Sequence, residues 1–122
     1  MTFARQELGK TGEDLAVREL TARGYAILAR RYRTRYGEID IICEDDGTIV
    51  FVEVRARATG EFGKAAETVT EWKQRKVAAR AAEYLTRHHV TDRPCRFDVV
   101  AIDDALSESP TVTVYPNAFE AG

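Results

Sequence analysis

The pair Asp46-Gly47, between two segments rich in Ile and Val, most constrains what this chain can fold into. Asp-Gly between β-branched runs is a strong signal for a β-hairpin, because both central residues of the tight type I′ turn need φ > 0. A hairpin over residues 37–55 has a fixed register, in which Ile42 pairs with Phe51. One face of this hairpin carries apolar residues and is expected to be buried: Ile39, Ile41, Val52 and Val54.

Counting outward from the turn, the same register pairs Asp40 with Glu53 and Glu38 with Arg55 on the other face. Like charges directly opposite one another destabilise a sheet unless something neutralises them. Two opposed carboxylates supply hard oxygen ligands that suit Mg²⁺ or Mn²⁺, ions that bind through one or two carboxylates plus substrate phosphate. The pattern indicates phosphodiester chemistry, and an ordinary solvent-facing strand surface is the alternative.

A helix is predicted from about Leu8 or Gly12 to Arg23, with a capping pattern that begins at Thr11. At helical spacing Glu13 lies on the apolar stripe and therefore points inward. An inward carboxylate is costly to bury without a partner. Glu13 is either a further metal or water ligand at the acidic face of the hairpin or a first-turn acid that the helix dipole favours.

The end of a strand predicted over residues 25–33 interleaves arginines with tyrosines, from Arg30 to Tyr36. Guanidinium groups contact phosphates and aromatic rings stack on bases, so Arg31, Arg33 and Arg35 are candidate nucleic-acid contacts. An edge strand protected by positive charge is the alternative.

A loop over residues 56–69 is placed to close over a bound substrate, and a helix over residues 71–88 follows it. One face of that helix is predicted to be basic and carries Lys73, Lys76, Arg80 and Arg87. Lys73 and Lys76 are candidate nucleic-acid contacts, although such a stripe is also typical of a solvated helix face.

Two further strands are predicted over residues 95–102 and 111–115, and Asp98 is the single charge inside the first of them. Asp98 is expected to pair with Arg96 or Arg55, or else to support the acidic site. The element order α-β-β-β-α-β-β predicts one α/β domain over residues 1–122, with a central mixed sheet covered by helices on both faces.

The balance of 18 Lys and Arg against 20 Asp and Glu gives a net charge of −2, which offers no global argument for nucleic-acid binding. Cys43 and Cys95 lack metal-site spacing and are expected to be reduced. The chain has no signal-peptide pattern and no apolar run long enough to span a membrane. A cytoplasmic location is expected.

Taken in order and spacing, five segments resemble the uncharacterised bacterial YraN family: Gly12-Glu13, residues 37–40, residues 51–55, residues 69–73 and residues 96–100. Asp40 followed by Glu53-Val54-Arg55 is also similar to the D…(D/E)-x-K signature of restriction-endonuclease-like nucleases. The family itself resembles Holliday-junction resolvases. The resemblance implies a restriction-endonuclease-like fold in which the two acids bind metal, and part of the family's site lies near Lys73 and Gln74. Arg55 stands where the superfamily has Lys.

These observations together predict a divalent-metal-dependent endonuclease. Asp40 and Glu53 would hold Mg²⁺ or Mn²⁺, Glu13 would complete the metal site, and Arg55 would stabilise the charged transition state. Supporting roles are expected for Glu38, Gln74 and Asp98. The expected partner is nucleic acid, DNA ahead of RNA, and a homodimer would suit paired cuts. The alternative is a non-catalytic nucleic-acid-binding module on a degenerate nuclease fold.

Overall fold

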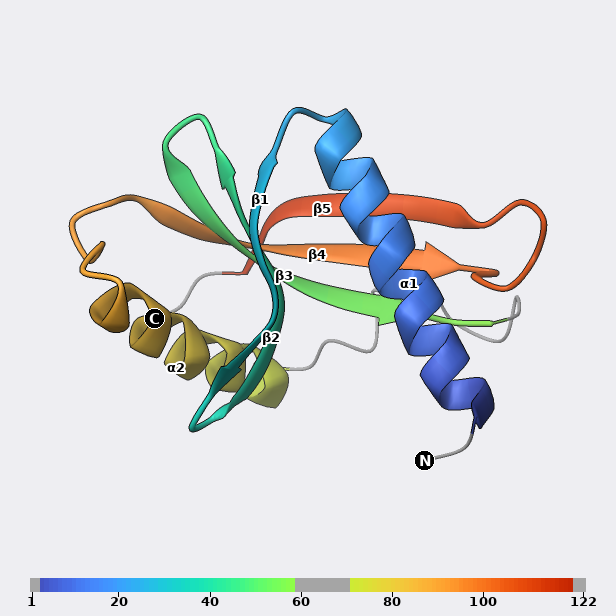
Figure 1. Ribbon diagram of the computed structural model, residues 1–122, viewed down its shortest axis with the longest axis horizontal. Coiled ribbons are helices and arrows are strands. Elements are labelled where there is room, and N and C mark those ends of the chain that lie inside the picture. Colours follow the sequence, from blue (N-terminus) through green and yellow to red (C-terminus); the bar gives the residue numbers. More distant parts are fainter. Residues whose placement is uncertain (1–2, 59–70, 120–122) are drawn as a thin grey trace.

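The computed structural model describes residues 3–58 and 71–119, with side chains for residues 7–58 and 74–118. The elements follow the predicted order (Figure 1): α1 (Phe3–Ala22), β1 (Ala26–Thr34), β2 (Gly37–Asp45), β3 (Thr48–Ala56), α2 (Glu71–Arg87), β4 (Cys95–Asp103) and β5 (Thr111–Phe119). The predicted loop over residues 56–69 lies largely outside the described residues.

The five strands form one sheet in the order β1-β2-β3-β4-β5. β3 and β4 are parallel, and the other neighbours are antiparallel, so the sheet is mixed as predicted. The parallel pair needs a crossover connection, which contains α2. Figure 1 shows α1 crossing one end of the sheet and α2 lying at the other end.

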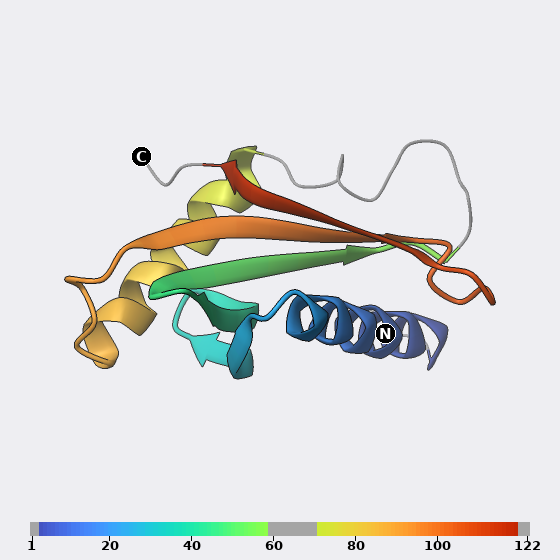
Figure 2. The ribbon, with the colours of Figure 1, turned by 90° about the horizontal axis from the view of Figure 1, so that it is seen from above.

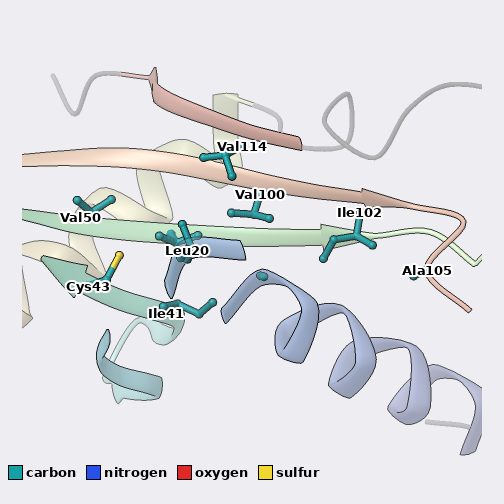
Figure 3. Close-up of a cluster of buried hydrophobic side chains, with 10 residues drawn as sticks. Leu20, Ile41, Cys43, Val50, Val100, Ile102, Ala105 and Val114 are labelled. Atoms are coloured by element: carbon teal, nitrogen blue, oxygen red, sulfur yellow. The ribbon is translucent and has the colours of Figure 1, made fainter. Parts of the chain in front are cut away.

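Side chains alternate between two cores on opposite faces of the sheet. In β3, Val50 and Val52 belong to an α1-side core that includes Leu20 of α1, and Figure 3 shows part of this cluster. Ile49 and Phe51 belong instead to an α2-side core, which includes residues of α2. Figure 2 shows α1 running along one side of β3. The prediction of helices on both faces is confirmed.

The tight turn at residues 46–47 has the predicted backbone, with φ of 49° at the first residue and 87° at the second. Pairing across the turn joins Ile42 to Phe51, as the sequence predicts, and continues to Ile41 and Val52. The antiparallel ladder between β2 and β3 ends there.

The predicted pairs of Asp40 with Glu53 and of Glu38 with Arg55 do not belong to the ladder, so this part of the register is wrong. β2 leaves β3 at this point and stays paired with β1, where Glu38 lies opposite Arg33. Figure 1 shows the β1–β2 hairpin turning away from β3. Counting outward from the turn therefore predicts the pairs correctly only as far as the two strands remain together.

A left-handed residue in β1 also changes which side chains share a face. Arg31 has φ of 51°, and both Arg30 and Arg31 reach Glu13 of α1. On the neighbouring strand Ile39 packs in the α2-side core whereas Ile41 packs in the α1-side core. The predicted common face for Ile39 and Ile41 is therefore wrong, because simple alternation does not hold through the segment opposite Arg31.

The first helix begins at Phe3, earlier than predicted, so Thr11 lies inside it and does not cap it. Gly12 lies where α1 crosses β3. A Cβ atom at Gly12 would stand 2.7 Å from the Cβ of Ala56, so the small residue allows the helix to approach the strand closely. The last strand is longer than predicted and extends to Phe119.

Candidate active site

A cleft of about 910 Å³ lies between α1 and the point where β2 and β3 separate. Five of the predicted site residues line it, from four different elements: Glu13, Arg31, Glu38, Asp40 and Arg55. Leu8, Gly9, Lys10, Val54 and Ala56 complete its lining. The tertiary structure thus brings together acidic and basic groups that are far apart in the sequence.

Glu13 is 7% exposed, and two arginines of β1 neutralise it. Arg30 Nε donates to its Oε1 at 2.8 Å, and Arg31 Nε donates to its Oε2 at 2.9 Å. Arg30 also donates to Asp14, and the hydrogen bonds to Asp14 and then Glu13 raise the pKa of the Arg30 guanidinium. The hydrogen bond to Glu13 raises the pKa of Arg31 in the same way. The inward carboxylate is therefore tolerated as part of an ion-pair cluster.

Asp40 lies where the two strands separate. Its Oδ2 accepts a hydrogen bond of 2.8 Å from the backbone N–H of Val54, which lies beyond the last ladder pair of β2 and β3. The carboxylate thus takes the place of a backbone acceptor from the departing strand. This bond fixes the Asp40 side chain where it lines the cleft.

Glu53 and Arg55 lie side by side at the end of β3. The Glu53 side chain is 5% exposed, and its Oε1 is 4.0 Å from Arg55 Nε. Arg55 Nε is buried and has no hydrogen-bond partner in the part of the chain that the structure describes. Glu38 pairs with Arg33 at 3.3 Å, so the cross-strand pair expected between Glu38 and Arg55 does not form. Arg55 lines the cleft, whereas Glu53 does not.

Among residues 7–58 and 74–118, no three His, Cys, Asp or Glu side chains lie close enough together to hold a metal ion. Both oxygens of Glu13 accept from arginines, so Glu13 is not arranged as a third ligand. Asp40 and Glu53 still offer the hard oxygen atoms that Mg²⁺ and Mn²⁺ prefer, and Mg²⁺ commonly uses only one or two carboxylates with waters and phosphate. The donor chemistry fits such a two-carboxylate site.

The predicted nucleic-acid contacts divide between two places. Arg31 lines the cleft, and Arg33 is highly exposed. Arg35 and Lys76 meet at a separate shallow hollow on α2. The side chain of Lys73 lies outside the described part of the chain, and Gln74 is half-buried at the start of α2 and does not line the cleft.

Two arginines differ from their sequence-based interpretation. Arg80 was expected on the basic face of the second helix, but it is 8% exposed. Its guanidinium donates to the backbone oxygens of Tyr36 and Glu38, both at 2.9 Å. Arg30 provides the second pairing partner of Glu13, and its place beside Arg31 in an arginine run was the only signal in the sequence.

Asp98 has a structural role away from the cleft. It is fully buried and accepts from Arg96 Nε at 3.0 Å and from the backbone N–H of Asn117 at 2.9 Å. The expected pairing with Arg96 is confirmed. These groups lie near Cys43, whose thiol pKa is raised to about 12 by burial and then by the charge of Asp98.

A mixed sheet covered on both faces, with a carboxylate at the separating strands of its central hairpin, has the architecture of a single restriction-endonuclease-like domain. In the described part of the chain, neither helix is apolar enough over sufficient length to cross a bilayer. The model of the uncharacterised protein family UPF0102 matches residues 12–102. The chain belongs to this family, which is the YraN family that its motifs indicate.

Several relatives are similar over most of their length. The UPF0102 protein of Anaeromyxobacter dehalogenans is 45% identical over 116 residues, which cover 95% of this chain and 86% of the relative. The UPF0102 protein STH1475 of Symbiobacterium thermophilum is 43% identical over 95% of this chain and 98% of the relative. The UPF0102 protein of Ralstonia pickettii is 52% identical over 82% of this chain and 83% of the relative. These names assign no activity.

Proposed function

We propose that this protein is a divalent-metal-dependent endonuclease that hydrolyses phosphodiester bonds of nucleic acid in the cleft between α1 and the separating strands β2 and β3. The observation that carries the proposal is the fixed carboxylate of Asp40 in a cleft shared with Arg55. Asp40 supplies negative charge for a cation, and Arg55 supplies a donor for phosphate.

The cation would be Mg²⁺ or Mn²⁺, held by Asp40 and Glu53, and when bound it would polarise the phosphoryl group and lower the pKa of a water. The hydrogen bond that Asp40 accepts from the Val54 N–H supports this role, because it holds the carboxylate in one place. Glu13 has a supporting role in the proposal: its carboxylate orients Arg31 toward the cleft, where the guanidinium would contact a substrate phosphate.

Arg55 would act by electrostatics. A guanidinium stays protonated at any working pH, so Arg55 does not serve as a general base, but its planar fork can hold two phosphate oxygens. Its buried Nε lacks a hydrogen-bond partner among the described residues, which is consistent with a donor that a bound phosphate would satisfy. One preorganised donor of this kind is commonly worth about 10²–10³ in rate.

The second candidate function is a non-catalytic nucleic-acid-binding module. Two observations favour it: both oxygens of Glu13 already bond to arginines, and Glu53 does not line the cleft. In that case the cleft would bind phosphate through Arg31 and Arg55 without cleaving it.

An Mg²⁺- or Mn²⁺-dependent cleavage assay on duplex, branched and single-stranded DNA and RNA tests the proposal. We expect the parent protein to cleave at least one substrate and Asp40→Asn and Glu53→Gln to lose that cleavage. Arg55→Lys should keep measurable activity, and Arg55→Ala should lose about 10²–10³ in rate. Asp46→Asn removes an exposed carboxylate in the hairpin turn and is the matched control, because Asn also tolerates φ > 0 there.

No metal-dependent cleavage of any substrate by the parent, together with retained nucleic-acid binding, would leave the binding module as the function. The same assay compares DNA with RNA, and sedimentation of the parent with its substrate tests the proposed homodimer. The proposal includes action on DNA ahead of RNA and a cytoplasmic location.

A further inference from the structure

The turn between β1 and β2 carries an exposed aromatic ring in a basic setting, away from the cleft. Tyr36 is 51% exposed. Two neighbouring hollows on α2, of about 660 Å³ and 460 Å³, both contain Arg35, Tyr36 and Ala79. We call the charged residues of these hollows together with Tyr36 the Tyr36 surface: Arg35, Tyr36, Arg75, Lys76, Glu83 and Arg87.

The turn that presents Tyr36 is held by hydrogen bonds from two side chains, Thr34 and Arg80. Thr34 Oγ1 donates to the backbone oxygen of Gly37 at 2.6 Å and accepts from the N–H of Tyr36 at 3.1 Å. Gly37 has φ of 120°, which L side chains rarely adopt. Arg80 of α2 donates to the backbone oxygens of Tyr36 and Glu38. The ring is therefore exposed on a fixed backbone, which lowers the entropy cost of binding to it.

The surroundings of the ring complement a polyanion. Of the described residues that line the two hollows, four are cationic and one, Glu83, is acidic. Glu83 is itself neutralised, because its Oε1 accepts from Arg35 Nε at 2.9 Å and its Oε2 lies 3.6 Å from Arg87 Nη2. The Arg35 guanidinium lies over the Tyr36 ring, with its Cζ 5.9 Å from the ring centre, and makes a cation–π contact with it. The α2 residues beside the ring are small, Ala79 and Ala82, and leave room for a planar group.

We propose that the Tyr36 surface binds an unpaired stretch of nucleic acid, with a base stacked on Tyr36 and the neighbouring phosphates at Arg75, Lys76 and Arg87. A base can stack on an exposed ring only if it is not already stacked within a duplex, so the chemistry selects single-stranded segments. This inference rests on the proposed function only for the class of ligand. It extends that function by making the preferred substrate one with a single-stranded part.

Binding of fluorescein-labelled oligonucleotides of about 12 nucleotides, oligo-dT and oligo-U, tests the inference by anisotropy in EDTA, where cleavage does not interfere. We expect Tyr36→Ala to weaken binding about tenfold and Tyr36→Phe to retain it, because the ring and not the hydroxyl stacks. Arg75→Ala and Lys76→Ala should each reduce the slope of log affinity against log salt by about 0.7. Comparing the two oligonucleotides distinguishes DNA from RNA.

Tyr115→Ala is the matched control, since Tyr115 is 38% exposed on β5 at the opposite edge of the sheet and should not affect binding. Unchanged melting temperatures would show that Tyr36→Ala folds normally. Parent-like affinity of Tyr36→Ala, or no binding by the parent, would overturn the inference. The inference would also be overturned if Tyr36→Ala weakened the binding of poly-glutamate as much as it weakens the binding of oligonucleotides. That result would show that the surface recognises anionic chains and not bases.

The two proposals fail separately in these experiments. A parent protein that binds oligonucleotides through Tyr36 but cleaves nothing with Mg²⁺ or Mn²⁺ contradicts the endonuclease and leaves the Tyr36 surface in place. A parent that cleaves while Tyr36→Ala binds and cleaves unchanged contradicts only the Tyr36 surface.

Discussion

Replacing Gly37 by alanine tests how α2 holds the turn between β1 and β2. A Cβ atom at this position would stand 2.7 Å from Arg80 Nη2 and 2.8 Å from Arg80 Cζ and Nε. The guanidinium does not move aside cheaply, because it is buried and donates to two backbone oxygens. The left-handed φ of 120° adds conformational strain of roughly 1–2 kcal/mol for a residue with a Cβ.

We therefore expect Gly37→Ala to lower the free energy of unfolding by about 3 kcal/mol, of which roughly half is backbone strain and the rest steric conflict with Arg80. Arg80→Met keeps the aliphatic part of the side chain and removes both hydrogen bonds. Leaving two partly buried carbonyl groups without donors should cost about 2–3 kcal/mol. In the double variant the steric conflict is absent, so its cost should be at least about 1 kcal/mol below the sum of the single costs.

Urea denaturation of the parent, both single variants and the double variant provides this cycle. Gly47→Ala is the matched control for strain alone, because Gly47 has φ of 87° in the other hairpin turn and a Cβ there would meet nothing within 4 Å. Arg75→Met controls for removing a charge from the exposed side of α2. Additive single costs within about 0.5 kcal/mol, or equal costs for Gly37→Ala and Gly47→Ala, would refute the proposed contact between Arg80 and the turn.

Three further predictions concern the buried thiol, the buried carboxylate and the metal. Because burial raises the pKa of Cys43 to about 12, a thiol reagent at pH 8 should label Cys95 and reach Cys43 only in denaturant. The stability that the neutral Cys43 thiol contributes is fully present below the pKa of the unfolded thiol, and it is lost as the pH rises toward 12. Equal labelling of both cysteines in the native protein would contradict this. Asp98→Asn should cost about 2 kcal/mol in urea denaturation because the fully buried carboxylate loses its charge-assisted hydrogen bonds from Arg96 and the Asn117 N–H, while Asp45 still pairs with Arg96 at 2.9 Å. A cost below about 0.5 kcal/mol would show that the pair is dispensable. Mn²⁺ at about 100 times its Kd should stabilise the parent by about 2.7 kcal/mol in thermal melts, and an equal shift in Asp40→Ala would place the ion elsewhere.

Local sequence signals determined the elements and the central hairpin. Asp46-Gly47 predicts the turn because few other residue pairs accept two positive φ values in succession. Alternation of β-branched residues and the 3.6-residue period of apolar positions predict the strands and α2. The pairing of Asp98 with Arg96 could be predicted because the two residues are close in sequence and a lone buried charge needs a partner.

For the candidate site, the sequence predicted which residues take part but not how they contact one another. Glu13 was expected inside from its helical position, and Asp40 was expected on the acidic face of the hairpin. The pairing of Glu13 with two arginines and the hydrogen bond from the Val54 N–H to Asp40 could not be predicted from the sequence, because both depend on where β2 leaves β3 and on the left-handed residue Arg31.

The same limit applies to Arg80. Its position in the sequence predicts a place on the basic, solvated face of α2, but it is buried against the turn at Gly37, 43 positions away. Periodicity assigns a residue to a face of its own helix, but it does not say what the face meets. The sequence by itself determined the order of the elements, the hairpin turn and the candidate acids, since these follow from interactions between near neighbours. The tertiary structure decided which charges meet, because contacts between distant segments depend on how far each pair of strands stays together and on how each helix crosses the sheet.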